Sequence, residues 1–134
     1  MYLLDTNVVS ELRKGRPHGG VVAWLETKDE AELFVSAVTL GELQAGVELT
    51  RKQDHSKADQ IELWIDHVAQ SYQVLSMDAP AFREWGKLMS GQPDSMMEDA
   101  MIAATARVHR LKVVTRNVKD FERFNVPVVN PFSR

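Results

Sequence analysis

The stretch Met1-Tyr2-Leu3-Leu4-Asp5-Thr6-Asn7 joins a short apolar run to polar residues, and helix-like spacing follows it. Such a run is typical of a buried strand in a parallel sheet that then passes into a helix. Asp5 would lie at the carboxyl end of this strand, where open α/β sheets bind their ligands. The stretch therefore predicts an α/β fold with a carboxylate at its ligand-binding edge.

The rest of the chain alternates between strand-like and helix-like segments. Further strands are predicted over residues 32–38, 73–77, 112–115 and 126–129, the last as a short edge strand because it contains a proline. Helices are predicted over residues 6–14, 21–27, 39–50, 58–69, 78–90 and 96–110. Strands that alternate with helices form a parallel sheet covered on both faces. We therefore expect a single domain over residues 1–134, a three-layer α/β/α fold with a central, mostly parallel sheet.

Composition narrows the chemistry that the protein can use. The 134 residues are 44% hydrophobic and 26% charged, which is ordinary for a soluble domain. The first strand begins at Tyr2 and no apolar run is long enough to cross a bilayer, so we expect a cytoplasmic protein without a membrane segment. There is no cysteine, which excludes disulfides, thiol nucleophiles and cysteine-bound metal centres. Any metal would need oxygen or histidine ligands.

The net charge of −3 argues against binding nucleic acid through a generally basic surface. However, if four carboxylates gather around cations, the remaining residues carry +1 and could form a basic rim around an acidic pit. An ordinary solvated helix surface is the alternative for every basic residue. The candidates for this rim are Arg13, Lys14, Arg16, Arg51, Lys52, Arg107, Arg110, Arg116 and Lys119.

Acidic and amide side chains follow the predicted strands or begin the predicted helices. These positions are Asp5, Glu42, Asp99, Asn117 and Asp120. Carboxyl ends of parallel strands meet at one edge of a sheet, so we expect these side chains to share one crevice. Because grouped carboxylates repel one another unless a cation neutralises them, the group predicts a site for Mg²⁺, or Mn²⁺, both of which prefer oxygen ligands. One or two such ions would activate water for phosphodiester hydrolysis.

Each position also has a simpler explanation. Asp5 could cap a helix, Asp99 could complement a helix dipole, and Asn117 with Asp120 could form an Asx-type turn. Thr39-Leu40-Gly41-Glu42 fits a capping box in which Glu42 reaches back to the Thr39 amide. Independent capping does not require that all these positions fall at one edge, which favours the metal site. The histidines lack ligand spacing and are expected to be structural or solvated: His18, His55, His67 and His109.

These residues resemble the PIN-domain family, specifically the VapC/FitB-like toxins of type II bacterial toxin–antitoxin systems. The resemblance covers nearly the whole chain. Its motifs match in order and spacing over Leu3–Leu12, Ser36–Leu43, Glu98–Ala106 and Val114–Phe121, and the tail Val128–Phe132 is also similar. One such motif alone would be weak, but four in sequence are specific.

The resemblance implies a Mg²⁺- or Mn²⁺-dependent endoribonuclease that cuts a structured RNA such as tRNA or rRNA. It also implies a homodimer, an inhibitory VapB-like antitoxin whose C-terminal segment lies over the active site, and larger assemblies on DNA through that antitoxin. Asp5, Glu42 and Asp99 match the family's acidic metal positions. Either Asn117 or Asp120 would complete the site. Supporting polar positions are matched by Thr6, Asn7 and Thr115.

Two other functions compete with this interpretation. The first is a phosphatase or phosphotransfer domain, which also places an aspartate after its first strand. A haloacid-dehalogenase-like phosphatase would need a second aspartate where this chain has Asn7, and a receiver domain would need an acceptor aspartate after its third strand. The second is a PIN module that binds a partner without catalysis. The intact acidic residues Asp5, Glu42 and Asp99 argue against it.

Overall fold

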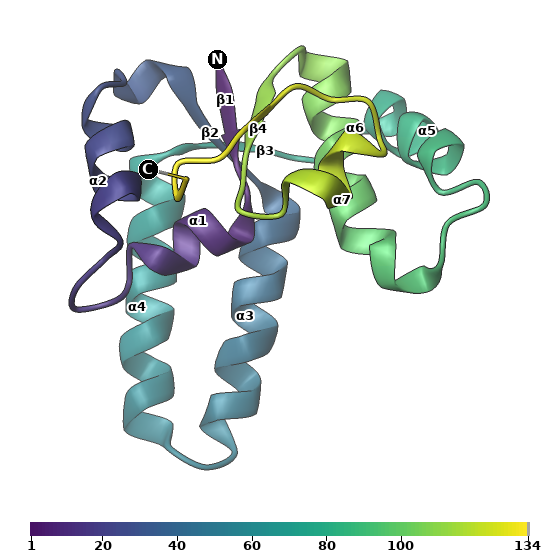
Figure 1. Ribbon diagram of the computed structural model, residues 1–134. Coiled ribbons are helices and arrows are strands. Elements are labelled where there is room, and N and C mark those ends of the chain that lie inside the picture. The colour runs from purple at the N-terminus through teal and green to yellow at the C-terminus, as the bar shows by residue number, and fades with distance from the viewer. Residues whose placement is uncertain (134) are drawn as a thin grey trace.

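A five-stranded sheet of wholly parallel strands forms the centre of the molecule, in the order β3-β2-β1-β4-β5 (Figure 1). The structure is a computed structural model that describes residues 1–133. The strands are β1 (Tyr2–Leu4), β2 (Leu33–Ser36), β3 (Gln73–Leu75), β4 (Lys112–Val114) and β5 (Val128–Val129). The predicted parallel sheet is therefore confirmed, and β5 lies at its edge as expected.

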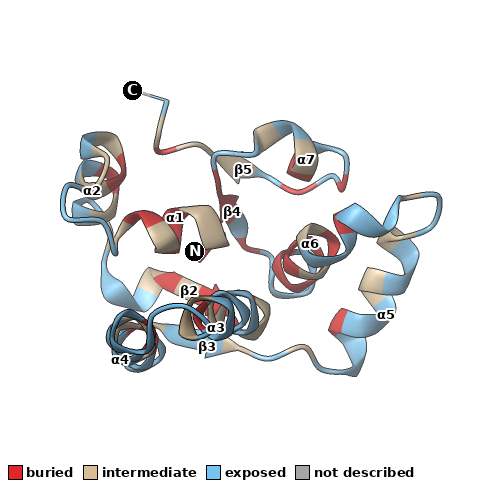
Figure 2. Ribbon diagram, turned by 90° about the horizontal axis from the view of Figure 1, so that it is seen from below, coloured by how far each residue is buried: buried red, intermediate tan, exposed pale blue. Residues whose placement is uncertain are grey.

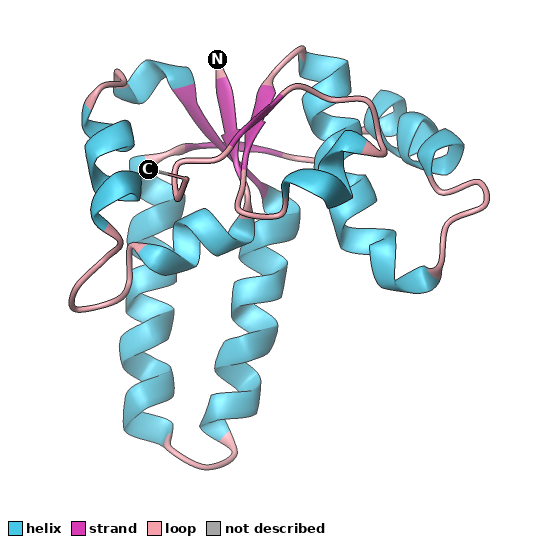
Figure 3. Cartoon of the chain, in the orientation of Figure 1, coloured by secondary structure: helices cyan, strands magenta, loops and turns pink. Residues whose placement is uncertain are grey.

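Helices connect the strands and cover both faces of the sheet (Figure 3). They are α1 (Thr6–Glu11), α2 (Gly19–Glu26), α3 (Ala37–Arg51), α4 (His55–Ser71), α5 (Ala79–Leu88), α6 (Met97–His109) and α7 (Val118–Glu122), with short 3₁₀ turns η1 (Glu30–Glu32) and η2 (Asp94–Met96). The predicted three-layer architecture is confirmed. Asp78 caps α5, since its Oδ1 accepts a hydrogen bond from the amide of Ala81 at 3.1 Å.

Each strand contributes alternate side chains to two separate cores, as the period of a strand requires. Leu3 and Val113 pack with α6 and α7, whereas Leu4 and Val114 pack with α1, α2 and α4. All four side chains are fully buried. Helix α6 can lie close to the sheet because most of its buried residues are small, and Figure 2 shows its buried surface. The two cores fix β1 and β4 at the centre.

The second strand ends two residues earlier than predicted. Residues 37 and 38 belong to α3 because the Ser36 hydroxyl accepts a hydrogen bond from the Val38 amide at 3.0 Å and caps the helix there. Helix α7 was not predicted, since only a turn was expected around Asn117 and Asp120. The first helix also ends early, at Glu11, and β3 ends at Leu75.

Helices α3 and α4 form an antiparallel arm that projects beyond the sheet (Figure 1). Val47, Ala58 and Ile65 pack between them as a small separate core. The apolar stripe predicted over 58–69 is thus largely a packing surface, and α4 begins three residues earlier because Asp54 caps it. Much of the outer surface of the arm is exposed (Figure 2).

Candidate active site

Asp5 lies at the carboxyl end of β1, in the middle of the sheet, and its side chain is anchored by three hydrogen bonds. Its Oδ1 accepts from the Thr6 amide at 2.8 Å. Its Oδ2 accepts from the Thr115 hydroxyl at 2.7 Å and from the Asn7 side-chain amide at 3.2 Å. Only 3% of the residue is exposed. Asp5 therefore caps α1 and also belongs to a network that joins β1 to β4.

Asn7 and Thr115 link the loops that follow β1 and β4. The Asn7 side-chain amide also donates to the Thr115 hydroxyl at 3.2 Å, and its carbonyl oxygen accepts from the Arg116 amide at 3.2 Å. The Thr115 hydroxyl in turn accepts from the Asn117 amide at 2.9 Å. These contacts position the chain after β4 directly beside Asp5. The three residues predicted to support the site, Thr6, Asn7 and Thr115, all donate hydrogen bonds to Asp5.

Glu42 reaches the same edge from the second turn of α3. Its Oε1 accepts a hydrogen bond from the Thr6 hydroxyl at 2.9 Å. The capping-box alternative is wrong, because Ser36 caps α3 and Thr39 lies inside the helix. The buried Thr39 hydroxyl instead lies 3.0 Å from that of Thr6. The sequence analysis missed this role of Thr39, although its position three residues before Glu42 places both on one helix face.

The acidic side chains influence one another electrostatically. Burial raises the pKa of Asp99 to about 6, with further contributions from Asp5, Asp120, Glu42 and Glu98. Burial also raises the pKa of Asp5, against the opposing effect of its hydrogen bonds, and the charge of Asp120 adds to the increase. Both Asp5 and Asp99 therefore lie in a partly desolvated, acidic environment, and no basic side chain is among the causes of either pKa shift.

Glu42 shares this environment, although the residue as a whole is exposed. Desolvation of its carboxylate raises its pKa, the Thr6 hydroxyl lowers it, and the charges of Asp5 and Glu98 raise it further. Four carboxylates from β1, α3, α6 and α7 are thus coupled at one edge of the sheet: Asp5, Glu42, Asp99 and Asp120.

Asn117 and Asp120 differ in how they relate to this group. Asp120 acts through its charge on both Asp5 and Asp99. It also lies 3.8 Å from Arg123, in a long and partly exposed ion pair. Asn117 joins the network through its backbone amide, and the residue is exposed. The Asx-type turn expected from these two residues is replaced by α7, which presents Asp120 in its first turn.

The chemistry of the donors fits a hard divalent cation. Each acidic member of the group offers carboxylate oxygens, and the neighbouring carboxylates add to the effect of burial in raising the pKa of Asp99. Within residues 1–133, however, no three His, Asp or Glu side chains already converge on a point where an ion would be held. These carboxylates would therefore have to come closer together to share an ion.

Several predicted rim residues lie far from this edge. Arg107 binds Glu84 and the carbonyl oxygens of Phe124 and Asn125, and Arg110 ends α6 next to the amino end of β4. Arg51 is engaged on the arm. The rim prediction is therefore wrong for these three residues, because the strand direction places them at the opposite edge or on the arm.

Other basic residues do lie near the acidic group. Arg13 lines a hollow together with Glu42, and Arg116 and Lys119 line another with Asp120. The histidines behave as expected where contacts are present: His18 caps α2 through its Nδ1, and His67 lies 3.4 Å from the Ser71 hydroxyl. Across the described part of the chain, no helix is long and apolar enough to span a membrane.

The fold and the acidic edge together define a class: a parallel α/β domain with a carboxylate group suited to hydrolytic chemistry on phosphate esters. The chain belongs to the PIN-domain family, since the family model for the PIN domain matches residues 2–126. Two relatives are each 34% identical to it. They are the VapC ribonuclease Y4jK of Sinorhizobium fredii, with 98% of each chain covered, and the toxin FitB of Neisseria gonorrhoeae, with 98% of this chain and 99% of the relative covered. The crystal structure of FitAcB from Neisseria gonorrhoeae matches over 100% of both chains with a TM-score of 0.88 and 32% identity.

Proposed function

We propose that this protein is a Mg²⁺- or Mn²⁺-dependent endoribonuclease and the toxin of a VapBC-like toxin–antitoxin pair. One observation carries the proposal: the carboxylates of Asp5, Glu42 and Asp99 lie at the ligand-binding edge of a PIN-domain sheet, each close enough to other carboxylates for their charge to raise its pKa. The similarity to a VapC ribonuclease and to the toxin FitB supports the activity and the biological role. The phosphatase alternative lacks a comparable observation.

The carboxylates of Asp5, Glu42, Asp99 and Asp120 would hold the cation. When bound, a divalent cation supplies positive charge for the phosphate oxygens and lowers the pKa of water so that it can attack phosphorus. The protein itself contributes by restricting the conformations of the side chains that would bind the cation. Thr115 and Asn7 fix the rotamer of Asp5, and Thr6 holds Glu42 near it. We propose Asp120, rather than Asn117, as the fourth ligand, because only Asp120 contributes charge to the group.

The substrate that we propose is a structured RNA, tRNA or rRNA, cut at an exposed loop in the cytoplasm. Single-stranded bases in such loops can be unstacked and read individually, whereas paired A-form RNA offers little access to its bases. We further propose that the toxin forms a homodimer and joins larger assemblies on DNA through its antitoxin, as the family resemblance implies.

The decisive test replaces the ligands by their uncharged isosteres. We expect Asp5→Asn and Asp99→Asn each to abolish cleavage of bulk tRNA and rRNA in Mg²⁺ or Mn²⁺, and also to abolish growth inhibition on expression. Lys112→Gln, an exposed residue at the opposite end of β4, serves as the matched control and should leave both activities unchanged. Cleavage by both aspartate variants at the wild-type rate would refute the proposal.

The antitoxin would bind along a groove that leads to the acidic group. Three hollows adjoin one another. Leu12, Ser71 and Tyr72 line both the first and the second hollow, and Trp64 lines both the second and the third. The third hollow includes Thr6 and Glu42. The groove thus combines apolar side chains along its length with Glu42, a member of the acidic group, in the third hollow. We propose that it receives an amphipathic antitoxin segment that ends in a basic side chain directed at the carboxylates.

This part of the proposal predicts a specific loss of inhibition. Leu12→Asp and Trp64→Ala should weaken capture of the co-expressed antitoxin, while cleavage by the isolated toxin persists. Leu49→Asp, which changes an exposed leucine on the outside of the arm, is the control. Normal capture of the antitoxin by both groove variants would show that it binds elsewhere.

A further inference from the structure

A polar hollow lies on the far side of Asp120 from the antitoxin groove. It has a volume of about 390 Å³, which is within the range of about 300–1,000 Å³ typical of ligand sites. Its lining comes from the loop after β4, the start of α7 and the chain after β5: Arg116, Asn117, Val118, Lys119, Asp120 and Asn130. Because Asp120 belongs to both, this hollow is continuous with the acidic group.

Two basic side chains, Arg116 and Lys119, line this hollow. Within residues 1–133, no salt bridge involves Arg116 or Lys119. Glu11 is close enough to Arg116 for its pKa to be lowered by that charge. However, the Glu11 carboxylate already accepts hydrogen bonds from the Lys14 ammonium and the His18 amide, at 3.0 and 2.9 Å. The donors of Arg116 and Lys119 thus remain available.

The guanidinium of Arg116 is held in place by the C-terminal tail. Its Cζ lies 3.9 Å from the ring centroid of Phe132, a close cation–π stack. Phe132 packs edge-on against His18 with 5.2 Å between the ring centroids, and its amide donates to the Asn130 side chain at 2.9 Å. The backbone amide of Arg116 is fixed separately by Asn7. The side chain is therefore oriented before any ligand arrives.

The tail itself fits closely against the start of α2. A side chain on Gly20 would place its Cβ 2.6 Å from the carbonyl oxygen of Pro131, so the tail can lie there only because this residue is a glycine. The Gly20 amide also donates to His18 Nδ1 at 3.0 Å. Through Phe132, this packing determines where Arg116 points.

We propose that Arg116 and Lys119 each bind a backbone phosphate of the RNA close to the scissile one, and that Phe132 positions Arg116 for this contact. The inference rests on the proposed ribonuclease function and adds a substrate-binding subsite to it. An acidic edge repels a polyanion, so a neighbouring pair of unneutralised cations would offset that repulsion where the strand must enter. Arginine suits the role because its planar donors can contact two phosphate oxygens at once. Asn130 lines the same hollow and can add an uncharged donor.

The binding test uses a fluorescein-labelled oligouridylate and protein carrying Asp99→Asn, which prevents turnover. Each phosphate contact contributes about 0.7 to the slope of log affinity against log salt for a single strand. We expect Arg116→Gln and Lys119→Gln each to lower this slope by about 0.7 and to weaken binding about 10-fold at low salt. Lys112→Gln removes the same charge at the other end of β4 and should do neither. An unchanged slope in Arg116→Gln would overturn the inference.

The positioning role of Phe132 is tested by kinetics in the otherwise wild-type enzyme, with a fluorophore–quencher oligoribonucleotide. Phe132→Leu should raise KM about 10-fold with kcat unchanged, and Phe132→Tyr, which keeps the stacking ring, should restore KM. A fall in kcat at constant KM would mean that the tail supports the fold instead. If the wild type does not cleave RNA in Mn²⁺, the ribonuclease proposal fails, whereas the salt slopes still decide whether the subsite exists.

Discussion

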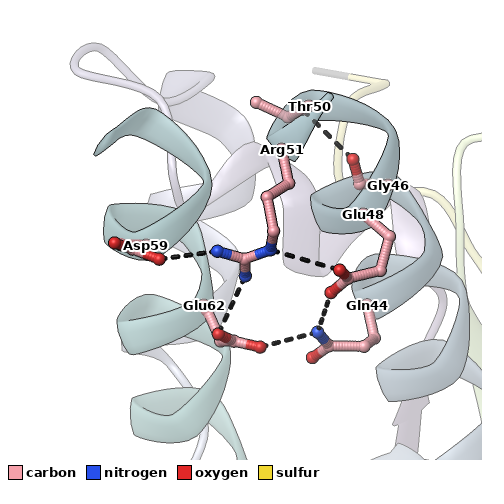
Figure 4. Close-up of polar contacts among 7 residues, drawn as sticks. All are labelled: Gln44, Gly46, Glu48, Thr50, Arg51, Asp59 and Glu62. Carbon is pink, nitrogen blue, oxygen red and sulfur yellow. Dashed lines mark hydrogen bonds and ion pairs between the residues drawn. The ribbon is translucent and has the colours of Figure 1, made fainter. Parts of the chain in front are cut away.

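Carboxylates cluster in two regions of this protein, and the two clusters differ in whether basic side chains pair with them. On the arm, Arg51 forms ion pairs with Glu48, Asp59 and Glu62 at 3.2, 2.7 and 3.0 Å (Figure 4). Gln44 joins the ring by donating to Glu48 and Glu62 at 2.8 and 2.7 Å. Hydrogen bonds from Gln44 and then Arg51 hold the pKa of Glu48 below its usual value.

At the carboxyl edge of the sheet, by contrast, no basic side chain within residues 1–133 forms an ion pair with Asp5, Glu42 or Asp99. The hydroxyls of Thr6 and Thr115 hold Glu42 and Asp5 but supply no positive charge, and the pKa values of Asp5, Glu42 and Asp99 are all raised. The carboxylates on the arm are paired within the chain, whereas, among the described residues, Asp5, Glu42 and Asp99 at the edge are not. That difference separates structural charges from functional ones.

The sharpest way to test this contrast is Asp99→Asn. We expect cleavage to fall by more than about 100-fold, because loss of a direct ligand should exceed the 10–100-fold cost of losing a supporting contact. The metal-free variant should nevertheless melt at a higher temperature than the wild type at pH 7, since an unfavourable charge has been removed. Thermal melting in EDTA and RNA cleavage in Mn²⁺ measure the two effects.

The matched change on the arm is Glu62→Gln, which should lower the melting temperature and leave cleavage intact. If both variants moved stability in the same direction, the proposed distinction between the two carboxylate groups would be lost.

Thr115→Val tests whether the hydroxyl beneath Asp5 supports the site. The substitution preserves shape but removes the 2.7 Å bond to Asp5 Oδ2. We expect a loss of about 10–100-fold in Mn²⁺ affinity or in kcat/KM, as for other outer contacts of metal ligands. Thr115→Ser keeps the hydroxyl and should retain most of the activity. Equal losses in both variants would point to packing rather than to the hydrogen bond.

A third measurement separates the two residues that compete for the last place in the site. Asp120→Ala removes a charge that acts on both Asp5 and Asp99, whereas Asn117→Ala removes none. We therefore expect Mn²⁺ affinity to fall in the order Asp99→Ala, Asp120→Ala, Asn117→Ala, from the largest loss to the smallest. Calorimetric titration of each purified variant gives the order directly. A larger loss from Asn117→Ala than from Asp99→Ala would contradict the assignment.

The position of Asp5 could be predicted because an apolar run of strand length dictates where the strand ends, and a parallel sheet brings such ends together. The same logic placed Glu42, Asp99 and Asp120 near it. The strand–helix junction at Ser36 could not be predicted. The residues on both sides of it are apolar, and the strand ends there because the Ser36 hydroxyl accepts one hydrogen bond from a backbone amide. Secondary-structure propensity alone does not show where the strand ends and the helix begins.

Which basic residues lie near the acidic edge could not be predicted from the sequence, for a different reason. Arg107, Arg110 and Arg116 are close along the chain, but α6 and β4 run in opposite directions between them and carry Arg116 to the other edge. Phe132 packs against His18, just before α2, although the two residues are more than a hundred positions apart in the sequence. Such pairings follow from the assembled topology and have no local signal.

Proton uptake by Asp99 gives a fourth and smaller effect. Its pKa in the folded protein, about 6, exceeds the ordinary aspartate value of 3.8, so between these values the folded state retains a proton that the unfolded state has lost. The stability of the metal-free protein should therefore fall as pH rises through this window and then level off. The difference in melting temperature between Asp99→Asn and wild type should grow from pH 4 to about pH 6.5.

Addition of Mn²⁺ should then raise the melting temperature of the wild type more at pH 7 than at pH 5, because protons compete with the cation for the carboxylates. A difference between variant and wild type that does not vary with pH would exclude Asp99 as the titrating group.

The smallest effect is expected from Arg51→Met, which deletes the centre of the charge network on the arm. Ion pairs at such exposed positions contribute little individually, and their attraction is screened by salt. We expect the melting temperature to fall by only a few degrees at low salt and by less in 1 M NaCl, with kcat and KM unchanged. Lys52→Met, at the adjacent position, is the control, because Lys52 forms no salt bridge within residues 1–133. If Arg51→Met reduced cleavage as much as Thr115→Val, the arm would have to act on the acidic group through α3, which carries both Arg51 and Glu42.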